Sequence, residues 1–116
     1  MARPPKILPA MFYQSAGGGE PVRDWLKGME QADRRAIGSD IATVECGWPV
    51  GMPTCRSLGD GLWEVRTKLA QGRIARVIFV IFEERMVLLH AFIKKTAKTP
   101  KAELDLARTR KKELKR

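Results

Sequence analysis

The chain has 116 residues, with 22 Lys and Arg against 13 Asp and Glu and a formal net charge of +9. This length fits one domain over residues 1–116, and an apolar fraction of 44% is too high for a disordered chain. The longest unbroken apolar run, Val77–Phe82, has six residues. A membrane-spanning helix needs roughly 20, which excludes an integral membrane protein of that kind.

The element pattern in chain order predicts an α+β fold. Lys6–Gln14 is a short apolar run, and Pro9 favours an edge strand because proline cannot donate to a sheet ladder. After a loop at Ser15–Gly19, Glu20–Met29 and Gln31–Glu45 are expected to form a helical hairpin. Their apolar stripes are Val22, Trp25, Leu26 and Met29 in the first helix and Ala32, Ala36, Ile37, Ile41 and Val44 in the second.

The second half of the chain is expected to supply the sheet. Cys46–Ser57 contains two glycines and two prolines and is predicted to be a loop. Three strands joined by three-residue turns then form an antiparallel meander, at Leu62–Leu69, Arg73–Phe82 and Met86–Lys94. Thr99 is expected as the N-cap and Pro100 as the first residue of a last helix. Its inward positions are predicted to be Ala102, Leu104, Leu106, Ala107 and Leu114.

Two features of the chain concern its setting and cofactors. Cys46 and Cys55 are too few for a disulfide framework, which favours a reducing cytoplasm. With the single histidine they make a poor zinc site, because zinc takes four closely spaced ligands, so we expect no metal and no other cofactor. Met1–Lys6 has no long apolar stretch after its positive charges, so no secretory signal is expected.

Positive charge is concentrated in the second half of the chain. Residues 1–58 carry 7 basic and 6 acidic side chains, whereas residues 59–116 carry 15 basic and 7 acidic ones. Such asymmetry is typical of proteins that bind a polyanion, and a solvated basic surface is the plainer alternative. Nucleic acid is favoured over a membrane surface because the last helix lacks a large aromatic or Leu-rich face.

Strand alternation places two arginines opposite each other. Glu64, Arg66 and Lys68 share one face of the first meander strand. With three-residue turns, Arg66 lies opposite Arg76, and Arg76 lies opposite Phe92. Like charges in that position are destabilising, so an anion is expected between the two guanidinium groups. Arg76 also interrupts an apolar face and must reach water, a carboxylate or a phosphate.

The same register brings further side chains to this face, and the predicted catalytic set is Glu64, Arg66, Arg76, His90 and Lys94. Such a set is suited to metal-free RNA cleavage, in which the 2′-OH attacks the adjacent phosphate and basic groups stabilise the developing charge. Glu64, His90 and a lysine remain open as proton-transfer groups. The plainer alternatives are that Arg66 pairs with Glu64 and that His90 is a hydrogen-bonded core histidine.

Three stretches of the sequence resemble the phage-related HigB-like branch of the RelE/ParE toxin superfamily. They are LWEVR at Leu62–Arg66, RIARV at Arg73–Val77 and LLHAFIKKTAKTP at Leu88–Pro100. The resemblance implies a RelE-like fold and the toxin of a type II toxin–antitoxin system that cuts mRNA in the ribosomal A site. The implied partners are mRNA, ribosomal RNA and a cognate antitoxin, often a helix-turn-helix protein, in the bacterial cytoplasm.

The resemblance also implies roles for individual residues. Arg76 matches a strand arginine that contacts the scissile phosphate, and Arg66 matches a nearby basic residue. The basic residues expected at the RNA or ribosome are Lys68, Arg73, Lys95, Lys98, Lys101 and Arg108. Some relatives have a proton-transferring tyrosine near the C-terminus, but the only tyrosine here is Tyr13. The superfamily contains gyrase-directed toxins, so gyrase inhibition and non-catalytic RNA binding are the alternative functions.

Overall fold

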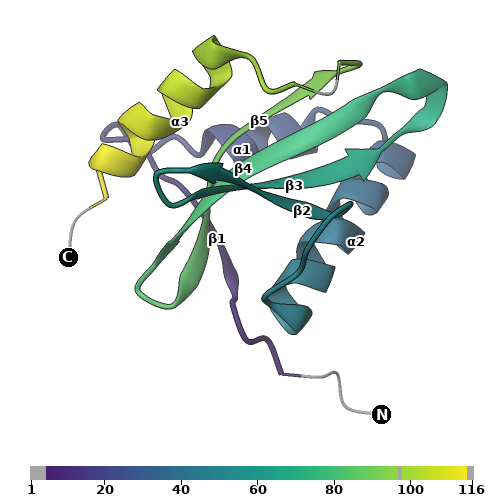
Figure 1. Cartoon of the computed structure of the whole chain (residues 1–116). Coiled ribbons are helices and arrows are strands. Elements are labelled where there is room, and N and C mark those ends of the chain that lie inside the picture. Colours follow the sequence, from purple (N-terminus) through teal and green to yellow (C-terminus); the bar gives the residue numbers. More distant parts are fainter. Residues whose placement is uncertain (1–4, 97, 115–116) are drawn as a thin grey trace.

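A five-stranded mixed sheet separates two layers of helices in the computed structural model, which describes residues 5–96 and 98–114 (Figure 1). The strand order is β1-β5-β4-β3-β2. The elements are β1 (Ala10–Phe12), α1 (Pro21–Lys27), α2 (Gln31–Gly47), β2 (Cys55–Gly59), β3 (Leu62–Lys68), β4 (Ile74–Phe82), β5 (Arg85–Lys94) and α3 (Lys101–Lys112). No helix among the described residues is long and apolar enough to cross a membrane.

The two faces of the sheet carry separate apolar cores, because side chains alternate along each strand. Helices α1 and α2 cover one face, where Ile37 and Val44 pack with Val65, Val77 and Phe79. Helix α3 covers the other face, where Ala107 packs with Leu62, Ile78 and Leu89. The central strand β4 is buried on both faces, as predicted for Arg73–Phe82.

The N-terminal strand is at an edge of the sheet, as predicted, but it is shorter than expected. β1 pairs in parallel with β5, and only Ala10–Phe12 is paired. Residues before Pro9 attach to the end of α2 instead, because the amides of Ile7 and Leu8 donate to the Glu45 carbonyl at 2.8 and 2.9 Å. The buried Glu45 carboxylate also accepts the Ala10 N–H at 2.7 Å. These bonds divide the predicted Lys6–Gln14 strand.

The predicted three-stranded meander is wrong in its strand count, because β2 was assigned to the Cys46–Ser57 loop. β2 pairs antiparallel with β3, with Cys55 opposite Val65 and Arg56 opposite Glu64. The glycines and prolines of that loop all lie before Cys55, so they mark where the loop ends rather than the absence of a strand. With β1 on the far edge, the sheet has five strands.

The register across β3, β4 and β5 matches the prediction at the positions that matter for the site. Arg66 lies opposite Arg76, Arg76 opposite Phe92, and Ile78 opposite His90. The second turn was predicted wrongly: Phe82 pairs with Arg85 rather than Met86. The turn residues are only Glu83 and Glu84, both with positive φ, as two-residue hairpin turns require. The turn thus has one residue fewer than predicted. A register shift between Ile78 and Phe79 compensates for it, so that Ile78 and Arg76 keep their predicted partners.

The helices follow their predicted stripes with three exceptions. Ala32 is exposed at the start of α2, although Ile37, Ile41 and Val44 are buried. In α3, Ala102 and Leu106 are exposed, and Ala107 is the buried residue.

The predicted N-cap of the last helix is also wrong. Pro100 is the N-cap of α3 and makes no side-chain cap bond. The Thr99 hydroxyl is not a cap because it donates to the Glu64 carboxylate at 2.5 Å.

The buried thiol of Cys55 predicts a pH dependence of stability. Burial raises the pKa of Cys55 from its ordinary 9.0 to about 11. Between these values the unfolded chain loses this proton and the folded chain retains it. The free energy of unfolding should therefore fall from pH 9 to pH 11, by at most about 3 kcal/mol. Urea unfolding at a series of pH values measures this change. The free energy of unfolding of Cys55→Ala should depend less on pH than that of the wild type, whereas Cys46→Ala should keep the wild-type dependence. The same pH dependence in Cys55→Ala and wild type would contradict the assignment to Cys55.

Candidate functional site

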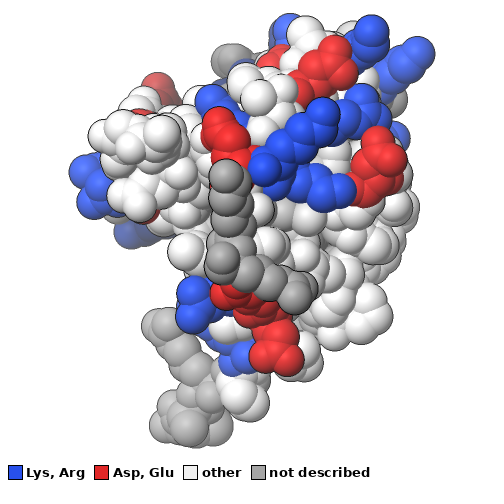
Figure 2. Space-filling view, turned by 90° about the vertical axis from the view of Figure 1, so that its left-hand side faces the viewer, with Lys and Arg blue, Asp and Glu red and all other residues white. Residues whose placement is uncertain are grey.

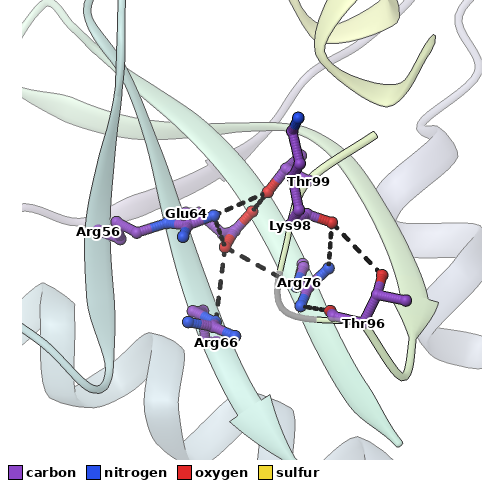
Figure 3. Close-up of polar contacts among 7 residues, drawn as sticks. All are labelled: Arg56, Glu64, Arg66, Arg76, Thr96, Lys98 and Thr99. Carbon is purple, nitrogen blue, oxygen red and sulfur yellow. Dashed lines mark hydrogen bonds and ion pairs between the residues drawn. The ribbon is translucent and has the colours of Figure 1, made fainter. Parts of the chain in front are cut away.

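Three guanidinium groups surround the carboxylate of Glu64, which is fully buried (Figure 3). Glu64 Oε1 lies 3.5 Å from Arg56 Nη2, 3.7 Å from Arg66 Nε and 3.8 Å from Arg76 Nε. We call these four residues the arginine cluster. Three positive charges against one negative charge leave the cluster a net charge of +2.

The pairing of β2, β3 and β4 brings the arginine cluster together. Arg56 lies opposite Glu64, and Arg66 lies opposite Arg76 in the neighbouring row. Because Glu64 and Arg66 are two residues apart on β3, both project from the same face. The anion expected between the two arginines is therefore the carboxylate of Glu64. The pairing of Arg66 with Glu64 is the one given by the plainer alternative.

Arg76 is enclosed within the protein. Its side chain has no exposed surface, and its guanidinium group donates to the carbonyl of Thr96 and, at 3.3 Å, to the carbonyl of Lys98. It also lies 5.9 Å from the centroid of the Phe92 ring. Burial lowers the pKa of Arg76, and the charge of Glu64 opposes that shift. Arg76 thus reaches a carboxylate, one of its predicted partners, but does not reach the surface.

Arg66 is the member of the cluster that opens onto a cleft. Its side chain is 16% exposed and lines a cavity of about 500 Å³ at the edge of β3. Lys68, which is exposed, lines the same cavity. Arg66 therefore joins the buried cluster to a space that a ligand can enter.

Arg56 was missed by sequence reasoning because its strand was not predicted. Its side chain is 32% exposed, and it donates to the Thr99 hydroxyl at 3.1 Å. Thr99 in turn donates to Glu64, so Arg56, Thr99 and Glu64 form one chain of contacts. The available signal was the spacing of Arg56 and Leu58, which are two residues apart and so would project from the same face of a strand.

His90 lies away from the arginine cluster. Its Nε2 is 2.7 Å from Glu103 Oε1 on α3, and its ring stacks on Phe92 with centroids 5.6 Å apart. Phe92 thus lies between His90 and Arg76, since it also contacts the Arg76 guanidinium group. This is the hydrogen-bonded histidine of the plainer alternative.

Lys94 is exposed at the end of β5, opposite Ile74. Of the predicted catalytic set, the structure brings together Glu64, Arg66 and Arg76.

The predicted RNA-binding residues divide into two groups. Lys68, Lys95, Lys98 and Lys101 are exposed. Arg73 instead forms a bidentate pair with Asp33 at 2.9 and 3.2 Å, and hydrogen bonding to Asp33 raises the Arg73 pKa. Arg108 pairs with Asp60 and Asp105. The four lysines are therefore the more available cations. Figure 2, which views the molecule from the side on which α3 lies in Figure 1, shows acidic side chains interspersed among basic ones there.

Across residues 5–96 and 98–114, no group of three or more His, Cys, Asp and Glu side chains is placed to hold a metal ion.

The enclosed position of Arg76 predicts a structural role. Arg76→Met should lower the free energy of unfolding by roughly 3 kcal/mol, because it removes one partner of a buried carboxylate. Urea unfolding measures this change. Arg35→Ala, an exposed position in α2, is the control and should stay within about 0.5 kcal/mol of wild type. Unchanged stability of Arg76→Met would show that the guanidinium group is not enclosed in solution.

Comparison with known proteins identifies the family of the chain. No curated protein matches it significantly. Residues 24–112 match the model of a family described as phage derived protein Gp49-like (DUF891). The matched span runs from α1 to the end of α3 and contains the whole arginine cluster. The chain therefore belongs to the phage-derived Gp49-like family, a toxin-like family that is common in toxin–antitoxin systems.

Proposed function

We propose that this protein is the toxin of a type II toxin–antitoxin system and cuts mRNA in the ribosomal A site without a metal ion, so that translation stops. The family membership implies a cognate antitoxin, for which we propose a helix-turn-helix protein. The observation that carries the proposal is the net charge of +2 in the arginine cluster, beside a cavity lined by Arg66.

The arrangement suits a phosphate because its charge is held in place before a ligand arrives. Glu64 neutralises only one of three guanidinium groups, and the strand pairing fixes their positions. Lys68, Ile74 and Lys94 form the row next to Arg66 and Arg76, and both lysines are exposed. Fixed positive charge of this kind stabilises charge that develops on phosphate oxygens.

The proposed reaction is an internal transesterification of RNA. The 2′-oxygen gives its proton to water and bonds to phosphorus, the bond from phosphorus to the 5′-oxygen breaks, and the 5′-oxygen takes a proton from water. The products are a 2′,3′-cyclic phosphate and a 5′-hydroxyl end. In this scheme Arg66 contacts the phosphate, supported by Lys68 and Lys94. Glu64 and Arg76 are positioning residues, since both are buried: Glu64 pairs with Arg66, and Arg76 pairs with Glu64.

Substitution of Arg66 tests this scheme. Arg66→Ala should slow mRNA cutting by about 10²–10³-fold, the usual effect of removing a charge-stabilising donor. It should remain folded, because Glu64 keeps Arg56, Arg76 and Thr99 as partners. Mapping of mRNA 5′ ends in a translation extract measures the rate, with Arg35→Ala as a matched loss of one surface arginine.

Three results would contradict the proposal. Wild-type rates of cutting in Arg66→Ala would place the reaction elsewhere. DNA damage with intact mRNA would indicate a gyrase inhibitor of the same fold. Binding of RNA that weakens steeply with salt, with no new 5′ ends, would indicate a non-catalytic RNA-binding protein.

A further inference from the structure

A cavity of about 500 Å³ lies beside Arg66, at an edge of the sheet that β2 leaves uncovered. The pairing of β2 begins with Cys55 opposite Val65, so β3 continues past Val65 without a strand on that side. The last contact is the Arg66 N–H, which donates to the Thr54 carbonyl at 2.7 Å. Beyond it, helix α2 forms the opposite wall with Ala36, Ser39 and Asp40.

Three polar groups at this cavity lack partners among the described residues. Thr67 is only 3% exposed, and its hydroxyl has no hydrogen-bond partner there. Asp40 forms no ion pair within the same part of the chain. The Lys68 N–H points to the uncovered edge, because the Leu69 N–H donates toward β4 and successive amides alternate.

The size and lining of the cavity fit a nucleobase. Small-molecule sites typically measure about 300–1,000 Å³ and combine apolar walls with a few polar groups. Ala36 and Ile74 supply apolar surface, and Asp40 supplies a carboxylate that only accepts hydrogen bonds. A base with two adjacent donors satisfies a carboxylate best. Guanine has such a pair in N1–H and the N2 amino group, beside an O6 acceptor that suits the Thr67 hydroxyl or the Lys68 N–H.

We propose that this cavity binds the guanine base of the nucleotide next to the phosphate held by Arg66. This inference rests on the proposed function for its RNA substrate. Asp40 accepts hydrogen bonds from N1–H and the N2 amino group, and the donors at Thr67 and Lys68 serve O6. The cavity therefore determines where along the mRNA the chain cuts, and Arg66 links base recognition to the phosphate.

Nucleotide binding tests the cavity without any requirement for catalysis. NMR titration of the whole protein with GMP, AMP, CMP and UMP should show the tightest binding for GMP, with amide shifts at Asp40, Thr67 and Lys68. Asp40→Asn should weaken GMP binding about 10- to 100-fold, the usual discrimination of a bidentate contact, and remove the preference for GMP. Glu84→Gln, which removes an exposed charge at the β4–β5 turn, should bind GMP as the wild type does.

Cleavage mapping then separates this inference from the proposed function. Asp40→Asn should lose the preference for guanine at the cut site and cut guanine-containing sites more slowly, whereas Glu84→Gln should keep the wild-type rate and pattern of cuts. Equal binding of all four nucleotides, or an unchanged pattern of cuts in Asp40→Asn, would overturn the inference and leave the nuclease proposal intact. Selective GMP binding without any mRNA cutting would instead overturn the proposed function and leave the guanine site of the cavity standing.

Discussion

Arg76 lies in the middle strand of the sheet with no exposed surface, and an unbalanced charge there would cost several kcal/mol. Glu64 on β3 supplies the balance, but it is itself fully buried and attracts two further guanidinium groups, those of Arg56 and Arg66. The need to neutralise one interior arginine thus creates a cluster with surplus positive charge. Because the cluster spans three paired strands, the strand pairing fixes the backbone positions of all its members.

The same arrangement places two similar side chains in different surroundings. Arg76 holds the chain after β5 through the carbonyls of Thr96 and Lys98 (Figure 3). The exposed lysines of that segment, Lys95 and Lys98, are therefore carried on backbone that a buried arginine anchors. Arg66, which lies directly opposite Arg76 on β3, reaches the cavity. In the proposed function Arg76 positions the charge of the cluster, and Arg66 contacts the substrate.

Local sequence patterns were sufficient to predict the pairing of β3, β4 and β5, but not the elements that surround these strands. Alternation and short turns predict Arg66 opposite Arg76, because both depend only on neighbouring residues. β2 and Arg56 were missed, since a five-residue strand after a Gly- and Pro-rich stretch has little signal of its own. The enclosure of Arg76 depends on where the chain runs after Lys94, and the Thr99–Glu64 bond joins residues 35 positions apart. Neither is encoded in a local pattern.

In the proposed function Arg66, and not Arg76, contacts the phosphate of the RNA. The most direct measurement is the NMR signal of each arginine Nε–H during titration with a 2′-O-methyl RNA, which binds but cannot be cut. The Arg66 signal should shift and its exchange with water should change, while the Arg76 signal should stay in place. A shift confined to Arg76, or no shift at any arginine of the cluster, would contradict this assignment.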